Sequence, residues 1–152
     1  MNGATLRTLV HDSLAGRGFE RRHANWYRQT KDTIQVINIQ KSDFGGQHFI
    51  NLAICLLPLW SFQDYPREEQ CHIRTRLDAL YENKEGVREC FDLENQTISL
   101  GDRKTCIHEA MTVANQWFDA LSTCELVKHR LELNPKLRNR ATLDVRRFLG
   151  IE

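Results

Sequence analysis

The chain has 152 residues, 41% of them hydrophobic and 27% charged, a composition that excludes a fibrous repeat or an intrinsically disordered protein. Its formal net charge of +1 excludes a strong overall attraction to nucleic acid or to anionic membranes. A chain of this length buries roughly two thirds of its unfolded surface. We therefore expect a single domain over residues 1–152, with a helix and an antiparallel sheet in 1–100 and helices in 101–152 packed on it.

No segment is typical of a membrane span or of a secretion signal. The longest apolar run, Phe49–Trp60, contains Asn51 and Pro58 and is shorter than the roughly 20 residues that a membrane helix needs. The first ten residues lack a continuous apolar stretch and a small-residue cleavage site. We expect a cytoplasmic protein without membrane contact.

The cysteines are five in number and stand singly at Cys55, Cys71, Cys90, Cys106 and Cys124, without a CxxC pair. An odd, scattered set is not typical of a disulfide framework or of a zinc site. We therefore expect reduced thiols, most of them buried, as is usual for free cysteine.

The first predicted element is a helix over residues 5–15, because Leu6, Leu9, Val10 and Leu14 recur at helical spacing. Gly16 follows as a candidate for the C-terminal cap. This helix presents one apolar stripe, so we expect it to pack on the sheet.

Three strands are predicted next, since β-branched and aromatic residues replace the helical pattern. They cover Asn25–Gln29, Thr33–Ser42 and His48–Leu57, and Lys31-Asp32 is the turn between the first two. The loop over residues 43–47, with its Gly-Gly pair, leads into the third strand.

A two-residue turn sets the register of the first hairpin, placing Trp26 opposite Ile37 and Asn25 opposite Asn38. One face then carries the apolar Trp26, Ile37 and Ile39. The other face is mixed, with Asn25, Tyr27, Val36, Asn38 and Gln40. The loop does not determine the register of the third strand, so the position of Asn51 relative to this polar face stays open.

Residues 71–78 fit two interpretations. Alternating Cys71, Ile73 and Thr75 favour a fourth strand, whereas Pro66 followed by acidic residues and a helical spacing of Ile73 and Leu77 favours a helix. Alternation over residues 89–94 predicts a fifth strand paired with the fourth.

Helices are predicted beyond Gly101. The apolar stripe from Ile107 to Leu121, preceded by Asp102 as a cap, indicates the first. Ser122 and Glu125 form a capping-box pattern for a second helix that stops before Pro135. A last helical segment covers residues 136–149. The expected fold is α+β, an antiparallel sheet of about four to five strands with an N-terminal helix and a C-terminal helical layer.

Four runs of the chain, GFERRHANWYR, VINIQKS, FINLAI and CHIRTRL, resemble the bacterial family catalogued as domain of unknown function number 4304. The resemblance covers roughly residues 6–93, and its most specific pieces are Gly18-Phe19, Gln40-Lys41-Ser42, Asn51-Leu52 and Arg74-x-Arg76. It implies an α+β domain, and it implies no activity, cofactor or catalytic residue.

One set of polar side chains is a candidate ligand site: Asn25, Asn38, Gln40, Asn51, Arg74 and Arg76. Carboxamides supply a donor and an acceptor, and arginine supplies a rigid fork for carboxylate or phosphate. On one sheet face they would recognise an anionic or amide-rich ligand. The alternative interpretation, which we favour at this stage, is that they satisfy buried backbone groups beneath the C-terminal helices.

The loop over residues 58–66 is a candidate protein interface, because it holds Trp60, Phe62 and Tyr65 within six positions. Aromatic residues are enriched at interaction hot spots, and they also dominate protein cores. The loop is therefore predicted to be either an interface or a lid on the core.

The segment 128–147 is basic, with seven lysines and arginines against two acidic residues. Such a segment is the main argument for a nucleic-acid or acidic-protein partner. It lacks aromatic residues for stacking on bases apart from Phe148, so a nucleic-acid partner is not favoured.

No residue pattern predicts catalysis, a metal site or a cofactor: the six histidines are scattered, and GxSxG and phosphate-binding glycine motifs are missing. We expect a cytoplasmic, non-catalytic binding module, for example an immunity-like or inhibitor protein that masks a partner protein. A small-ligand binder or enzyme that uses the carboxamide and arginine face is the alternative, and nucleic-acid binding through the basic C-terminal helices is a second one. The oligomeric state stays open.

Overall fold

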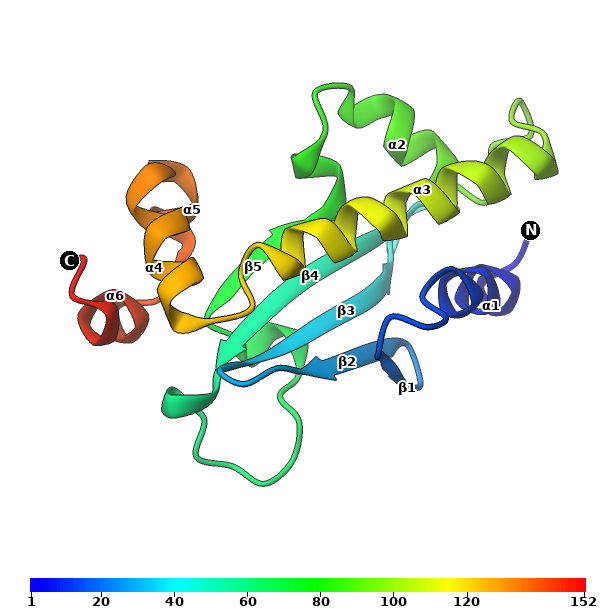
Figure 1. Cartoon of the computed structure of the whole chain (residues 1–152). Coiled ribbons are helices and arrows are strands. Elements are labelled where there is room, and N and C mark those ends of the chain that lie inside the picture. Colours follow the sequence, from blue (N-terminus) through cyan, green and yellow to red (C-terminus); the bar gives the residue numbers. More distant parts are fainter.

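The computed structural model describes residues 1–152 and contains one antiparallel sheet whose five strands follow each other in chain order (Figure 1). The strands are β1 (Glu20–Arg22), β2 (Asn25–Gln29), β3 (Thr33–Lys41), β4 (His48–Leu56) and β5 (Ile73–Arg76). The predicted α+β class with an N-terminal helix and C-terminal helices is confirmed.

The chain also forms six α-helices: α1 (Gly3–Ser13), α2 (Lys84–Phe91), α3 (Leu100–Asp119), α4 (Cys124–Leu133), α5 (Pro135–Arg140) and α6 (Leu143–Leu149). Three short 3-10 helices lie at Leu57–Leu59, Glu68–Gln70 and Leu77–Leu80. In Figure 1, α3 runs along the sheet, α1 lies near one end of the molecule and α4–α6 cluster at the other. None of the helices is both long and apolar enough to span a membrane.

The predicted register of the β2–β3 hairpin is confirmed. Trp26 lies opposite Ile37 and Asn25 opposite Asn38, and the amide nitrogen of Thr30 donates to the carbonyl of Thr33 across the turn at 2.8 Å. The register of β4, which the sequence left open, places Asn51 opposite Asn38. The polar side chains of three strands therefore share one face.

The opposite face, which we call the covered face, forms the main core. Trp26, Ile37, Leu52 and Ile54 are completely buried there, in a cluster of 29 residues that also takes side chains from all six α-helices. Burial of each large apolar side chain contributes roughly 1.5–3 kcal/mol. The alternation of the strands and the apolar stripes of α1 and α3 meet on this face, which is why the sheet and these two helices pack together.

Polar groups on the covered face are bonded to other elements. Gln35 is fully buried, and its amide nitrogen donates to the carbonyl of Phe118 in α3 at 3.0 Å. The guanidinium of Arg28 donates to the Gln35 side chain at 2.7 Å, to Asn115 at 2.9 Å and to Asp119 at 3.0 Å. These bonds replace the water that burial removes, so polar side chains are tolerated under α3.

Two strand assignments differ from the sequence-based expectation. The strand predicted over residues 89–94 is wrong: residues 84–91 form helix α2, which Asn83 caps by accepting from the amide of Gly86 at 3.0 Å. Val87, Cys90 and Phe91 then share a buried helical face, a spacing that the alternation of their neighbours concealed. The sheet still has five strands, because β1, a short exposed strand that the sequence analysis did not predict, precedes β2.

The two interpretations of residues 71–78 resolve to a strand of four residues, β5, followed directly by the 3-10 helix Leu77–Leu80. The predicted helix caps at Asp102 and Ser122 are wrong, since Ser99 and Thr123 accept the capping hydrogen bonds. The last predicted helix is two helices, because Thr142 caps a new start at α6.

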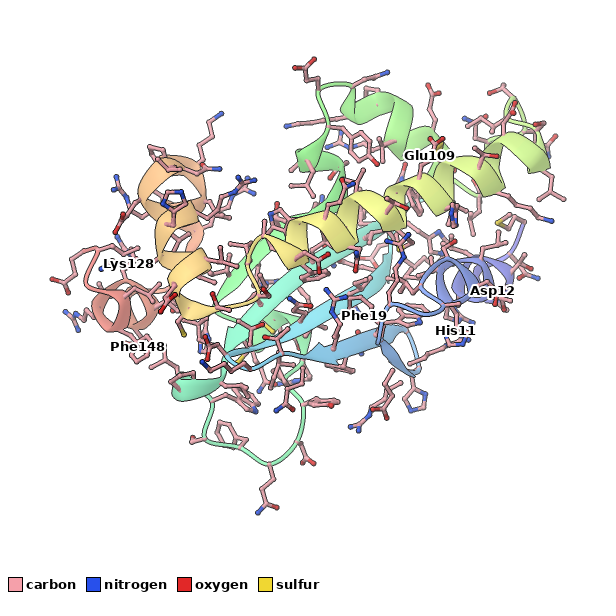
Figure 2. All side chains as sticks on the ribbon, viewed as in Figure 1. His11, Asp12, Phe19, Glu109, Lys128 and Phe148 are labelled. Carbon is pink, nitrogen blue, oxygen red and sulfur yellow. A yellow bond between two sulfur atoms is a disulfide. The ribbon has the colours of Figure 1, made fainter.

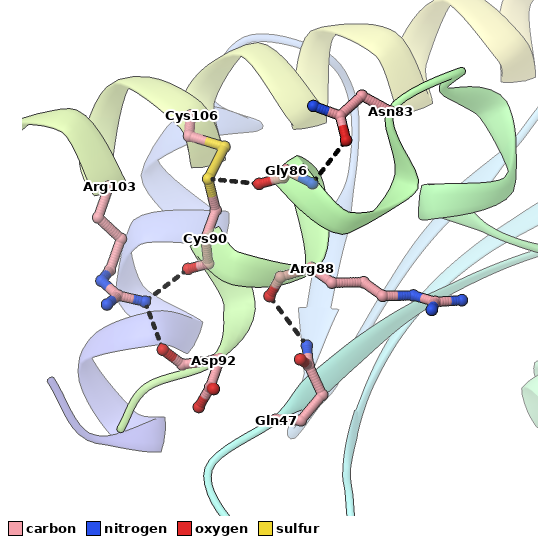
Figure 3. The surroundings of a disulfide bond; sticks show 8 residues. All are labelled: Gln47, Asn83, Gly86, Arg88, Cys90, Asp92, Arg103 and Cys106. Atoms are coloured by element: carbon pink, nitrogen blue, oxygen red, sulfur yellow. Dashed lines mark hydrogen bonds between the residues drawn. A yellow bond between two sulfur atoms is a disulfide. The ribbon is translucent and has the colours of Figure 1, made fainter. Parts of the chain in front are cut away.

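A disulfide joins Cys90 of α2 to Cys106 of α3, as Figure 3 shows. Beside it, the buried guanidinium of Arg103 donates to the carbonyls of Cys90 at 2.7 Å and Asp92 at 2.9 Å. The expectation of five reduced thiols is wrong for this pair. A strand over residues 89–94, as the alternation predicts, would not bring Cys90 against the later helix, whereas helix α2 does.

Candidate functional site

The second face of the sheet has two unlike halves. One half, which we call the closed half, is apolar: Tyr27, Ile34, Val36, Ala53 and Cys55 are buried beneath Cys71 and the loop that follows β4. That loop lies on the side of the sheet away from α3 (Figure 1). It covers only part of the face, so the strand ends beyond it are free to carry polar side chains.

The other half, which we call the open half, carries all six residues of the predicted ligand site. Asn25, Asn38, Asn51 and Arg76 are direct neighbours across β2, β3, β4 and β5. Gln40 and Arg74 stand two residues along their strands from Asn38 and Arg76 and therefore share the same side of the pleat. The structure thus brings together residues that lie up to 51 positions apart in sequence, from Asn25 to Arg76.

The amides of the open half bond to one another. The Asn38 amide nitrogen donates to Asn25 at 2.7 Å, and the Asn51 amide nitrogen donates to Asn38 at 3.1 Å and to Gln40 at 3.0 Å. These hydrogen bonds leave the Asn51 side-chain oxygen and the side-chain nitrogens of Asn25 and Gln40 without a protein partner. One acceptor and two donors therefore remain unused on this face.

The two predicted arginines differ in their partners. Arg74 donates twice to the buried carboxylate of Glu68, at 2.8 and 3.0 Å, and this hydrogen bonding raises the pKa of Arg74 above its ordinary value. Arg76 forms no ion pair and lies 4.1 Å from the ring centre of Phe49. The first arginine is therefore neutralised within the protein, whereas the second keeps an uncompensated charge over the sheet.

A cleft of about 380 Å³ opens over this half of the sheet, and we call it the sheet cleft. Its lining residues include Gln40, Asn51, Glu68, Arg74, Thr75, Arg76, Asp78, Lys84, Arg88 and Arg140. Five cationic side chains thus surround two carboxylates, and each carboxylate already has an arginine partner, Glu68 with Arg74 and Asp78 with Arg88. The cations of the sheet cleft therefore outnumber its carboxylates by three.

Sequence reasoning missed three cations of the sheet cleft. Lys84 and Arg88 are four residues apart on α2 and face the cleft together, but their segment was not recognised as a helix. Arg140, from α5, donates to the hydroxyl of Thr75 at 3.2 Å. Its position depends on how the C-terminal helices pack against β5, which no local pattern reveals.

The loop over residues 58–66, which we call the aromatic loop, has aromatic side chains both against the core and in solvent. Tyr65 stacks on Tyr27 of the closed half with ring centres 4.8 Å apart, and Trp60 packs on the same cluster. Phe62 contacts Trp60 but is 68% exposed. The loop therefore closes the core with Tyr65 and presents Phe62 to the surroundings.

The free thiols are poor nucleophiles. Burial raises the pKa of Cys55 to about 12 and raises that of Cys71 further, and burial followed by the nearby Asp32 raises the pKa of Cys124. A thiol attacks as its thiolate. At neutral pH these three side chains are protonated, so none is poised for nucleophilic catalysis in this geometry.

The basic residues of the segment 128–147 are divided between different surfaces. Arg130, Lys136 and Arg140 line one groove beside α4 and α5. Lys128 does not line it, and Figure 2 places Lys128 with Phe148 at the end of the molecule remote from α1. The segment therefore does not present all of its charges as a single stripe.

Comparison with known proteins identifies a family and no individual relative. No curated protein and no solved structure matches the chain. The family model described as Domain of unknown function (DUF4304) matches residues 10–120. The match extends beyond the resemblance noted in the sequence and takes in all five strands, α2 and α3. The chain therefore belongs to the family of the domain of unknown function DUF4304.

Proposed function

We propose that the protein is a non-catalytic binding module and that the open half of its sheet holds the acidic surface of a partner protein. The observation that carries this proposal is the unbalanced charge of the sheet cleft. Arg76, Lys84 and Arg140 line it without forming an ion pair. Carboxylates on a partner would complement them, which favours rapid and selective association.

The aromatic loop supports a protein as the partner. Arginine and aromatic side chains are the residues most enriched at interaction hot spots. Glu68, from the segment that follows the aromatic loop, lines the sheet cleft and pairs with Arg74, so loop and cleft adjoin. Phe62 and Arg76 would then belong to one contact surface, with an apolar anchor at one side and charges at the other.

A masking role, as in an immunity or inhibitor protein, and a cytoplasmic location complete the proposal. The Cys90–Cys106 disulfide is more typical of an oxidising compartment. The proposed cytoplasmic location therefore predicts that this bond is reduced in the cell. Mass spectrometry of protein alkylated directly in host cells tests the location, because a cytoplasmic population is expected to show both thiols modified.

Purification from the native host under gentle conditions tests the binding proposal. We expect a stoichiometric partner with the wild-type chain and with a Lys128→Glu control. With Arg76→Glu plus Lys84→Glu we expect retention of the partner to fall roughly tenfold or more, as is typical of hot-spot charges. Release of the wild-type chain alone, or equal retention by the double variant, would overturn the proposal.

A small anionic ligand is the second candidate, and the size of the sheet cleft favours it. Its volume of about 380 Å³ falls within the roughly 300–1,000 Å³ of small-molecule sites. Asn51 and Gln40, each with one side-chain atom that has no protein partner, line it. Native mass spectrometry of the purified chain distinguishes the two candidates, since a retained small molecule adds a discrete mass that Arg76→Glu removes.

A further inference from the structure

A second depression, which we call the helix groove, lies between the edge of the sheet and the C-terminal helices. It has a volume of about 220 Å³ and takes side chains from β5, the 3-10 helix Leu77–Leu80, α2, α3, α4 and α5. Four of its lining residues are cations: Lys84, Arg130, Lys136 and Arg140. No acidic residue lines it.

These four charges are not neutralised within the protein. None of the four takes part in an ion pair, and Arg140 alone has a side-chain partner, the neutral hydroxyl of Thr75. All four residues are exposed, so water screens part of the interaction, and the rest is repulsion between like charges in one concavity. An anion with several charges would remove this repulsion.

The floor of the helix groove is apolar. Ala79, Leu80, Trp117 and Leu137 line it, and Trp117 and Leu137 are more than nine-tenths buried. Asn134 uses its side-chain oxygen to cap α5 by accepting from the amide of Leu137 at 3.1 Å, which leaves the amide nitrogen as a further donor. Cations and one amide donor thus line the groove together with two buried apolar side chains, Trp117 and Leu137, whereas Ala79 is exposed.

We propose that the helix groove binds a small organic anion that carries two or more negative charges, on phosphate or carboxylate groups, attached to an apolar body. The number of cations sets the charge of the ligand, because a single negative charge would leave most of the repulsion in place. The volume limits its size to less than that of most drug-like ligands, which occupy about 300 Å³ or more. Arginine and lysine each bind both phosphate and carboxylate. The titration below therefore identifies which of these two groups the ligand carries.

This site is separable from the proposed partner surface. Arg130 and Lys136 line the helix groove and not the sheet cleft, whereas Arg76 lines the sheet cleft and not the groove. Lys84 and Arg140 line both. The inference therefore goes beyond the proposed function, and either one can fail without the other.

Calorimetric titration with phenyl phosphate, pyrophosphate and phthalate, at constant ionic strength, tests the inference. We expect saturable 1:1 binding of phenyl phosphate or of phthalate, and the intrinsic tryptophan fluorescence is expected to change as phenyl phosphate binds. Arg130→Ala plus Lys136→Ala is expected to weaken binding at least tenfold. Lys128→Ala plus Arg147→Ala removes the same charge from outside the groove and is expected to leave affinity within about twofold, as is Arg76→Ala.

The three probes distinguish the possible charged groups and test the apolar body. Preference for phenyl phosphate identifies phosphate, and preference for phthalate identifies carboxylate. Pyrophosphate binding as tightly as phenyl phosphate would overturn the apolar body. Failure of all three probes to saturate, or equal losses in the groove variant and the Lys128/Arg147 control, would overturn the site itself. Circular dichroism and thermal unfolding confirm that each variant is folded.

Discussion

The two faces of the sheet use the same strands in opposite ways. On the covered face, polar groups such as Gln35 and Arg28 bond to the backbone or side chains of α3. On the open half of the other face, Asn38 and Asn51 bond to neighbouring amides of the same sheet. The difference shows that the position of a polar side chain in a strand does not decide its role. Its role depends on what packs against it, because only a polar side chain that another element covers needs a hydrogen-bond partner from that element.

The largest expected effect concerns the covered face. Trp26→Ala removes a fully buried side chain from the centre of the main core, and it is expected to lower the free energy of unfolding by about 3–5 kcal/mol. Urea denaturation followed by circular dichroism measures this loss. A loss below about 1 kcal/mol would contradict the assignment of this face as the one that determines stability.

An intermediate effect is expected on the open half. Asn38→Ala plus Gln40→Ala removes three hydrogen bonds at partly exposed positions, and we expect the protein to stay folded with a loss of about 1–3 kcal/mol. The same double variant is expected to lose partner binding. If it instead unfolds while Trp26→Ala survives, the amides belong to the core and the contrast between the faces disappears.

A smaller effect is expected where the sheet edge meets the C-terminal helices. Burial lowers the pKa of His72 below its ordinary value, and Asp144 opposes this shift. Its ring nitrogen Nδ1 accepts from the amide of Leu56 at 2.9 Å and must be unprotonated to do so. The unfolded chain therefore binds the proton more readily, and stability falls as the pH decreases below about 6.5.

The variant His72→Asn keeps an acceptor and removes the titration. We expect its free energy of unfolding to vary less between pH 7 and pH 5 than that of the wild type, as measured by urea denaturation at each pH. A pH dependence as steep as that of the wild type would show that His72 does not carry this effect.

The sequence predicted the hairpin and its polar face because local rules apply there. A two-residue turn sets the register, and alternation then assigns Asn25 and Asn38 to the face opposite Trp26. The placement of Asn51 required the structure, since the loop before β4 has no fixed register. The hairpin therefore located Asn25, Asn38 and Gln40 on one face, whereas the other three site residues, Asn51, Arg74 and Arg76, joined them only once β4 and β5 were in place.

The rest of the candidate site depends on contacts between distant segments. The alternation of Glu89, Phe91 and Leu93 is typical of a strand and conceals helix α2. The signals for the helix are Asn83 at its N-cap and the helical spacing of Val87, Cys90 and Phe91. With α2 unrecognised, Lys84 and Arg88 could not be assigned to the sheet cleft, nor Cys90 to Cys106. Arg140 reaches the cleft from the far end of the chain, and such a position follows from tertiary packing alone.

The most direct test of the contrast between the two faces is a residue-resolved NMR titration with a polyglutamate peptide, which imitates an acidic protein surface. We expect salt-sensitive chemical-shift changes at Gln40, Asn51 and Arg76, whereas the signals of α1 and of the covered face stay unchanged. Shifts that leave the open half untouched while affecting α1 or β1, or no saturable change at low salt, would contradict the assignment of the open half as the recognition surface.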